Sequence, residues 1–282
     1  MSPPQTQRLK IRIRDKRPPD VGSLLSLEVY ARREAISNFI REFRVWQRPL
    51  TAFCERFLRP GDVAVDVGAH IGYFATVFAN AVGAEGAVYA FEPDPDNFVI
   101  LERNKALNRF GQMSCQPLAV SDRAATMPLY RSLSNMWGSS LHSKSMHSTH
   151  VTVEAAPLDQ LLEVEQGPIR LIKIDVEGAE LDVLRGMTEL LARHATPPAI
   201  IMEFAPDQIE AADPGLGFIL GFAARHGFDI RLFIGHEGPS VVPPRVEAET
   251  LLRLHKDFLK FGEAAELDLL LITPEVLRQW AG

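Results

Sequence analysis

The central part of the chain alternates between short apolar runs and longer segments whose apolar residues recur at helical spacing. Runs of four to eight residues that are rich in β-branched side chains are typical of buried strands, and the longer periodic segments are typical of amphipathic helices. Strands are predicted near 63–67, 87–91, 113–118, 170–175, 198–204, 228–234 and 267–273, and helices near 72–82, 95–108, 180–191 and 217–226. Strict alternation of strand and helix predicts an α/β fold, with a mostly parallel sheet covered by helices on both faces.

The flanking and inserted segments have weaker patterns. Residues 1–19 are polar with a strand-like alternation at Leu9, Ile11 and Ile13, and we expect a frayed arm or a short edge strand. Amphipathic helices are predicted over 24–43 and 50–58. We place a domain boundary after residue 48, with an N-terminal arm and helical cap over 1–48 and the main domain over 49–282.

A Ser- and His-rich segment, 132–150, separates two short strands predicted at 126–130 and 151–155. A long loop within an α/β domain is often functional, and we expect this one to cover the carboxyl edge of the sheet on the substrate side. Its histidines lack the spacing of a zinc site, so no metal is predicted there.

The turn after the first core strand has the features of a ligand-binding turn. Asp66 ends an apolar run and is followed by Gly68 and Gly72, which let a ligand approach the backbone. Glu92 ends the next strand, where a carboxylate can bind a ribose diol. His70 stands where a dinucleotide fingerprint has its middle glycine, which argues against a pyrophosphate. A cationic ligand such as S-adenosylmethionine suits the Asp66 carboxylate better.

Three segments resemble the FkbM family of S-adenosylmethionine-dependent methyltransferases. They are Asp66-Val-Gly-Ala-His-Ile-Gly-Tyr-Phe74, Phe91-Glu-Pro-Asp94 and Ile172-Lys-Ile-Asp-Val-Glu-Gly-Ala-Glu-Leu181, and the similarity runs from about 49 to 204. The resemblance implies a class I, Rossmann-like methyltransferase with a seven-stranded sheet whose last hairpin is reversed. It also implies O-methylation of a hydroxyl on a sugar, glycolipid or natural product.

The expected cofactor site combines both lines of reasoning. Asp66 is placed near the methionine end, the two glycines beneath the ligand backbone, and Glu92 at the ribose. Ser121 and Asp122 follow the third strand, where adenine lies in doubly wound folds. The full predicted set is Asp66, Gly68, Ala69, His70, Gly72, Tyr73, Glu92, Pro93, Ser121 and Asp122.

Carboxylates at the ends of later strands are the candidates for acceptor chemistry. Methyl transfer needs positioning of the nucleophile, and a hydroxyl acceptor also needs a base. Asp175 is the favoured base or orienting group, with Glu177 or Glu203 as its partner. Two of these carboxylates holding Mg²⁺ is an open alternative, although no metal is indicated by the sequence.

Composition narrows the remaining function classes. A net charge of −6 and a pI near 5.8 argue against a nucleic-acid partner. Two cysteines, no signal pattern and no long apolar run predict a cytoplasmic protein without a membrane span. The expected partner is a small-molecule or glycan acceptor, and the sequence does not indicate the oligomeric state. A nicotinamide-dependent oxidoreductase and a non-catalytic nucleotide-binding protein are the alternatives.

Overall fold

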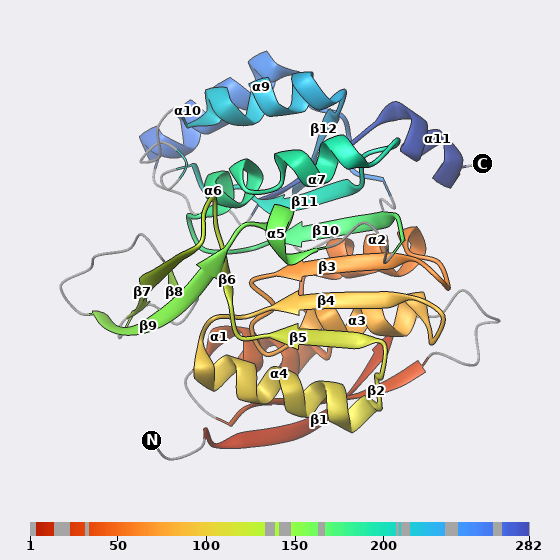
Figure 1. The fold of residues 1–282 in the computed structure, drawn as a ribbon, viewed down its shortest axis with the longest axis vertical. Helices are drawn as coiled ribbons and strands as arrows, with labels where there is room; N and C mark the ends of the chain where they lie inside the picture. The colour runs from red at the N-terminus through yellow and green to blue at the C-terminus, as the bar shows by residue number, and fades with distance from the viewer. Residues whose placement is uncertain are drawn as a thin grey trace.

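A seven-stranded sheet forms the centre of the computed structural model (Figure 1). The strand order is β12-β13-β11-β10-β3-β4-β5; β13 is antiparallel to both of its neighbours and the other four pairs are parallel. This order confirms the predicted mostly parallel sheet with its reversed last hairpin. The strands are β3 (Val63–Val67), β4 (Ala87–Phe91), β5 (Met113–Gln116), β10 (Ile169–Ile174), β11 (Ala199–Glu203), β12 (Asp229–Ile234) and β13 (Leu267–Ile272).

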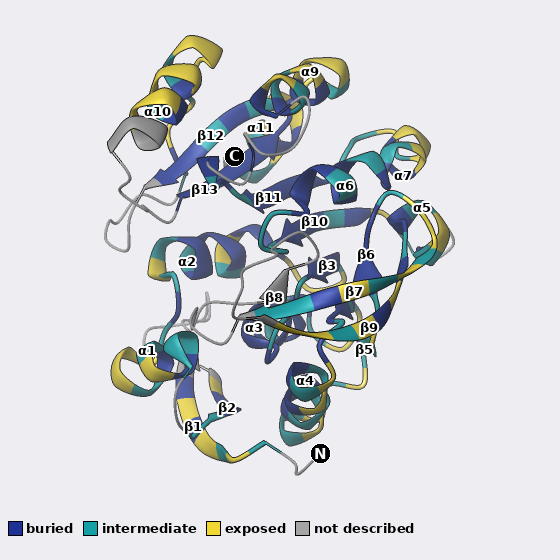
Figure 2. Ribbon diagram, turned by 90° about the vertical axis from the view of Figure 1, so that its left-hand side faces the viewer, coloured by how far each residue is buried: buried dark blue, intermediate teal, exposed yellow. Residues whose placement is uncertain are grey.

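Helices pack on both faces of this sheet. One apolar cluster joins one face to α1 (Ala35–Phe43), α2 (Arg48–Phe57), α3 (Tyr73–Val82), α4 (Pro95–Asn108) and α11 (Pro274–Ala281). A second cluster joins the other face to α5 (Leu158–Leu161), α6 (Glu180–Arg185), α7 (Thr188–Arg193), α9 (Leu216–His226) and α10 (Ala248–Phe261). Figure 2 shows the central strands largely buried and exposed residues on the outer sides of α9 and α10. The sheet edge where the strands end is therefore the part left open for a ligand.

A smaller sheet lies beyond the carboxyl ends of the central strands (Figure 1). It contains β6 (Ala119–Val120), β7 (Ala125–Ser132), β8 (Ser139–Ser140) and β9 (Ser148–Ala156) in the order β6-β9-β7-β8. The predicted strands at 126–130 and 151–155 are thus confirmed as parts of β7 and β9. The third core strand ends at Gln116, earlier than predicted, because β6 leaves the central sheet and pairs with β9.

The helix predicted over residues 24–43 is partly wrong. Residues 24–30 form a strand and not a helix: β1 (Thr6–Ile13) and β2 (Ser23–Tyr30) pair antiparallel, with Thr6 opposite Tyr30. Leu25, Leu27 and Val29 are buried at every second position, which is the period of a strand. The helix predicted over 24–43 is confirmed only in its second half, as α1.

Two asparagines of α4 connect this strand pair to the main domain. The Asn104 side chain accepts from Glu28 N at 2.5 Å and donates to Glu28 O at 2.9 Å and to Ile71 O at 2.7 Å. One turn later, the Asn108 side chain accepts from Ser26 N and donates to Ser26 O. These bonds pair backbone groups of β2 that its strand partner leaves unpaired, and Asn104 also bonds the ligand-binding turn.

The helix predicted over 180–191 is divided by Gly186 into α6 and α7. A Cβ added to Gly186 would lie 2.1 Å from the carbonyl oxygen of Ser121 and 3.0 Å from Cβ of Pro157. Close packing of these segments therefore requires glycine here and interrupts the helix.

The structure describes residues 4–13, 23–31, 34–132, 139–140, 148–162, 167–206, 209, 215–234, 242–261 and 267–281. Most of the segment predicted to cover the substrate side, 133–138 and 141–147, lies outside these residues. Within the described part of the chain, no helix has the length and apolar character needed to cross a membrane. The boundary after residue 48 stays a prediction, although Leu27 and Val29 share one apolar cluster with α3.

We expect Asn104→Ala to lower the free energy of unfolding by about 2–4 kcal/mol, because it leaves buried backbone groups of Glu28 and Ile71 without partners. Urea titration followed by circular dichroism measures this loss. Asn108→Ala is the matched control and should cost less, since its bonds are only partly buried. A stability for Asn104→Ala equal to that of the wild type would contradict this role.

Candidate functional site

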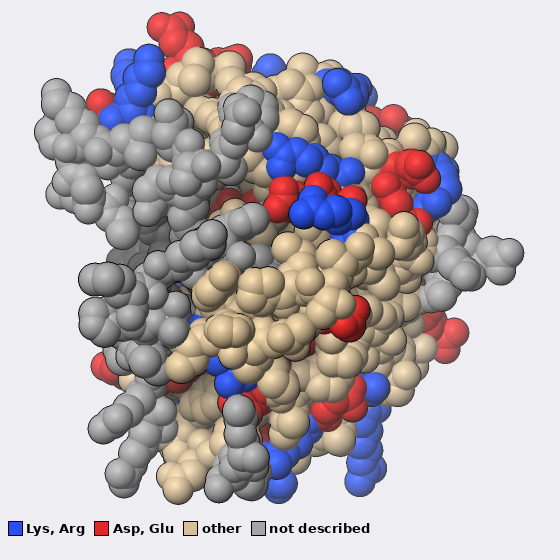
Figure 3. Space-filling view, turned by 60° about the vertical axis from the view of Figure 1, so that its left-hand side comes forward, with Lys and Arg blue, Asp and Glu red and all other residues tan. Residues whose placement is uncertain are grey.

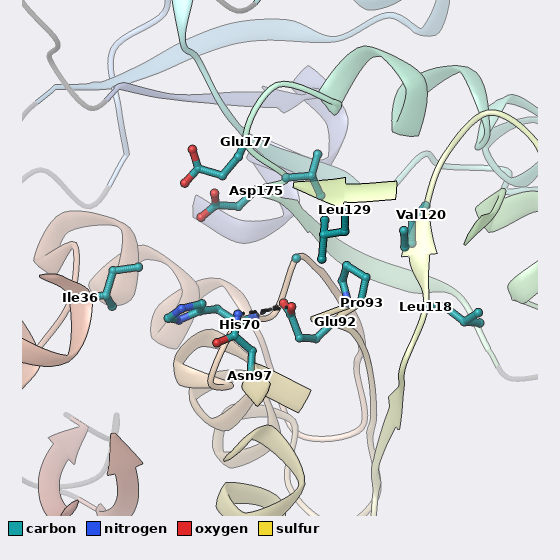
Figure 4. A pocket seen from close by; sticks show the side chains of 13 residues that line it. Ile36, His70, Glu92, Pro93, Asn97, Leu118, Val120, Leu129, Asp175 and Glu177 are labelled. Carbon is teal, nitrogen blue, oxygen red and sulfur yellow. Dashed lines mark hydrogen bonds between the residues drawn. The ribbon is translucent and has the colours of Figure 1, made fainter. Parts of the chain in front are cut away.

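A cleft open to solvent lies at the carboxyl ends of β3, β4 and β10. Figure 4 shows Asp175 and Glu177 on one side of it and His70 and Glu92 on the other. The lining residues are Ile36, Gly68, His70, Glu92, Pro93, Asn97, Leu118, Ala119, Val120, Leu129, Asp175, Val176 and Glu177.

Glu92 is held rigidly on the lower wall. Its Oε2 accepts from His70 N at 2.7 Å, the dashed contact in Figure 4, and its Oε1 accepts from Asp94 N at 2.8 Å. Asn97 Nδ2 donates to Oε1 at 3.4 Å. An ionised carboxylate has about four acceptor positions, so capacity is left for ligand hydroxyls.

Burial raises the pKa of the Glu92 carboxyl to about 8, and the negative charge of Asp94 adds to this effect. The N–H donors of Asp94 and His70 act in the opposite direction. Hydroxyl groups that donate to the carboxylate would likewise favour its ionised form.

Asp175 projects from the end of β10 on the upper wall. Its Oδ2 accepts from Lys173 Nζ at 2.8 Å, and Lys173 is only 2% exposed. Burial opposes the charged form of Lys173, but Asp175 and Asp66 raise its pKa above the ordinary value. Gly68 permits this arrangement, because a Cβ there would lie 1.8 Å from the carbonyl oxygen of Asp175.

The structure places Asp66 behind the cleft and not on its wall. Alternation along β3 turns Val65 and Val67 toward one face of the sheet and Asp66 toward the other, where it is 1% exposed. Neither carboxylate oxygen makes a hydrogen bond of ordinary geometry. Burial raises the pKa of Asp66 to about 6, with the positive charge of Lys173 opposing. The predicted direct contact of Asp66 with a ligand is therefore not supported by its position.

Two cleft residues, His70 with φ 52° and Glu177 with φ 54°, have a left-handed backbone that non-glycine residues rarely adopt. Among the other described residues of this kind, Arg44 and Arg109 are C-caps of helices, where the conformation is common, and Gln47 is the N-cap of α2. Strained backbone away from helix ends is concentrated at functional sites. The two outliers therefore support the cleft as the functional site.

Several predicted cofactor residues lie outside the cleft lining. Gly72 has φ 86°, and an added Cβ would lie 2.5 Å from Cδ1 of Leu101, so its role here is in packing. The Tyr73 hydroxyl pairs with that of Thr51 in α2. Ser121 is buried against Gly186, and Asp122 pairs with Arg123 at 3.0 Å. Ala69 is buried and donates its N–H to Phe91 O.

The sequence profile described as the methyltransferase FkbM domain matches residues 66–230, which is more than half of the chain. The chain belongs to the FkbM methyltransferase family. The match begins at Asp66 and includes the β10 segment with Asp175 and Glu177. It confirms the resemblance drawn from these segments.

Curated FkbM-type relatives align over part of their length. The hexuronic acid methyltransferase AglP of Haloferax volcanii is 34% identical over 143 residues, which cover 46% of this chain and 52% of the relative. The 31-O-demethyl-FK506 methyltransferase FkbM of Streptomyces tacrolimicus is 30% identical over 203 residues, which cover 61% and 75%. The chain thus spans about half the length of the first relative and three quarters of the second.

Among solved structures, a SAM-dependent O-methyltransferase from Thermotoga maritima aligns with a TM-score of 0.41 and 12% identity over 94% of this chain and 77% of that chain. An rRNA methylase from Streptococcus thermophilus aligns with a TM-score of 0.44 and 11% identity over 79% and 94%. These scores are too low to support an inference about this FkbM-family chain.

The apolar wall of the cleft was not predicted from the sequence. Leu118, Ala119 and Val120 come from the segment after β5, and Leu129 comes from β7. Ile36 of α1 and Asn97 of α4 also line the cleft. Asn97 could have been predicted from the sequence. It lies in the first turn of a helix whose start, Asp94-Pro95, comes two residues after Glu92. The apolar residues carry no such signal because they resemble ordinary core positions.

The face shown in Figure 3 carries Lys and Arg side chains interspersed with Asp and Glu side chains. On the described atoms of this face, no continuous basic surface forms. The absence of a nucleic-acid partner nevertheless stays a prediction.

Stability should fall as pH rises from about 5 to 8. The unfolded chain ionises Glu92 near its ordinary pKa of 4.5, whereas the folded chain keeps the proton up to about 8, so the folded state is favoured at the lower pH. The pKa of Asp66 is raised from 3.8 to about 6, so its ionisation also lowers the stability of the folded state as the pH rises toward 6. Thermal melts across this range should show a shallower decline for Glu92→Gln; an unchanged slope would mean that Glu92 ionises normally.

Proposed function

We propose that this chain transfers a methyl group from S-adenosylmethionine to a hydroxyl group of a sugar, glycolipid or natural product. The observation that carries the proposal is one cleft, at the carboxyl ends of parallel strands, with a buried Glu92 on one wall and a lysine-paired Asp175 opposite. Membership of the FkbM family supports the reaction class. The names of the relatives, a hexuronic acid methyltransferase and an FK506 methyltransferase, support sugar or natural-product acceptors.

The lining residues fit this cofactor. Leu118, Val120 and Leu129 form an apolar surface suited to an adenine ring, and the Glu92 carboxylate is placed to accept from ribose hydroxyls. Gly68 lines the opposite side of the cleft, where its backbone can contact the amino-acid end of the cofactor. When bound, the cofactor supplies an electrophilic methyl group.

The chain contributes positioning, charge and a base. Lys173 bonds Oδ2 of Asp175 at 2.8 Å and so fixes the carboxyl group, whose other oxygen can accept the proton of an acceptor hydroxyl. Asp66 has an indirect part in this proposal, since its negative charge supports the charged form of Lys173. The cytoplasmic location, the direct roles of Ser121 and Asp122, and the acceptor within its class stay predictions.

The cofactor assignment is tested by calorimetric titration with S-adenosylhomocysteine and, in parallel, with NAD. We expect Glu92→Ala to weaken S-adenosylhomocysteine binding by about 1–3 kcal/mol, the value of hydrogen bonds to a charged group. Glu189→Ala, which changes an exposed carboxylate on α7, is the control and should leave the affinity unchanged. Binding of NAD in place of S-adenosylhomocysteine would contradict the proposal.

Asp175→Asn should reduce methyl transfer by roughly 10²–10⁴-fold, the contribution of a positioned base, while S-adenosylhomocysteine still binds. Turnover is measured by mass spectrometry as a gain of CH₂ on acceptors in cell extract supplied with S-adenosylmethionine. Wild-type turnover in the variant would remove Asp175 from the base role, and a lack of transfer by the wild type would favour a non-catalytic binding protein.

A further inference from the structure

Three carboxylates converge beside the upper wall of the cleft. Asp175 and Glu177 follow β10, and Glu203 ends β11, the neighbouring parallel strand. Each offers one oxygen, and the three oxygens all lie within 4.8 Å of one another. Figure 4 shows the carboxylates of Asp175 and Glu177 side by side.

Glu203 provides a separate observation that points to a ligand. Its Oε2 is buried and makes no hydrogen bond with any described residue. A buried carboxylate oxygen without a partner is costly, and native structures satisfy such atoms with protein groups, water or an ion. The Lys173 ammonium bonds Oδ2 of Asp175 and does not supply a hydrogen bond to Glu203.

We propose that Asp175, Glu177 and Glu203 bind a hard divalent cation of the Mg²⁺ or Ca²⁺ type. Carboxylate oxygens are the ligands that both ions prefer. Oxygens on opposite sides of Ca²⁺ lie at most about 5 Å apart, and those around Mg²⁺ about 4 Å, given their bond lengths. Oxygens no more than 4.8 Å apart are close enough for one ion of this type to draw them together as ligands.

The ion would stand next to the proposed base. Because the Lys173 bond occupies Oδ2 of Asp175, Oδ1 would bind the cation in place of accepting the proton directly. A cation there would bind the acceptor hydroxyl and lower its pKa, which helps proton loss before transfer. This consequence rests on the proposed function, whereas binding of the ion itself does not.

The test uses the full chain, freed of metal and without cofactor. Mn²⁺ is titrated and followed by electron paramagnetic resonance, and Mg²⁺ and Ca²⁺ are added as competitors to decide which ion the site prefers. We expect one Mn²⁺ per chain in the wild type and a loss of affinity of roughly tenfold or more in Glu203→Gln and in Glu177→Gln. Glu189→Gln, an exposed carboxylate on α7, is the matched control and should bind as the wild type does.

Thermal melts of the same proteins show whether a variant that loses metal binding is still folded. Glu203→Gln should be at least as stable as the metal-free wild type, since it relieves the crowding of three carboxyl groups, but should gain no stability from added metal. Glu177 is half-buried, so its variant provides a second, milder probe. No binding by the wild type at millimolar metal, or binding that both variants retain, would overturn the site. Either outcome leaves S-adenosylhomocysteine binding untouched, so it is distinguishable from failure of the methyl-transfer proposal.

Discussion

A buried ammonium group determines how the end of the central sheet is built. Lys173 is almost without solvent contact, and its charge would be very costly there without partners. It bonds Asp175 at 2.8 Å, lies 4.7 Å from the centre of the Phe74 ring, and stands opposite Asp66 in the register of β10 and β3. The two carboxyl groups, Asp66 behind the cleft and Asp175 in front of it, both favour the charged form of Lys173.

The same region shows that the two sequence segments at the site form one structural unit. Gly68 in the first segment touches the carbonyl of Asp175 in the second, and Asp175 N donates to Val67 O. The Glu180 side chain stabilises the turn of the second segment by accepting hydrogen bonds from Val176 N and Gly178 N. The two turns therefore pack directly against each other, and each contains one non-glycine residue with left-handed backbone, His70 and Glu177.

The sequence predicted much of the sheet and its ligand-binding edge because local period and tertiary role agree there. β3, β4 and β10 are short apolar runs buried on both faces, and this pattern identifies them directly. The strand at residues 24–30 was not predicted because the helical spacing of Ile36, Ile40 and Phe43 in the following α1 masked the two-residue period of β2. Asp66 is a different case. Its place at the end of β3 follows from the sequence, but whether its side chain faces the cleft depends on how the helices and inserted strands pack on the sheet, and its contact with a ligand stays a prediction.

That dependence is clearest at the inserted sheet, which completes the cleft. Leu129 on β7 lines the apolar wall, and Arg131, two residues later on the same face, bonds Asp94 with its Nε at 2.6 Å and its Nη2 at 2.5 Å. Asp94 also caps α4 by accepting from Asp96 N, and its own N–H bonds Glu92. The apolar wall and the buried carboxylate are therefore joined through one aspartate at a helix start. Because Arg131 is charged and distant in sequence, no periodic pattern reveals this link, yet it fixes the distance between the two surfaces that the proposed cofactor would contact.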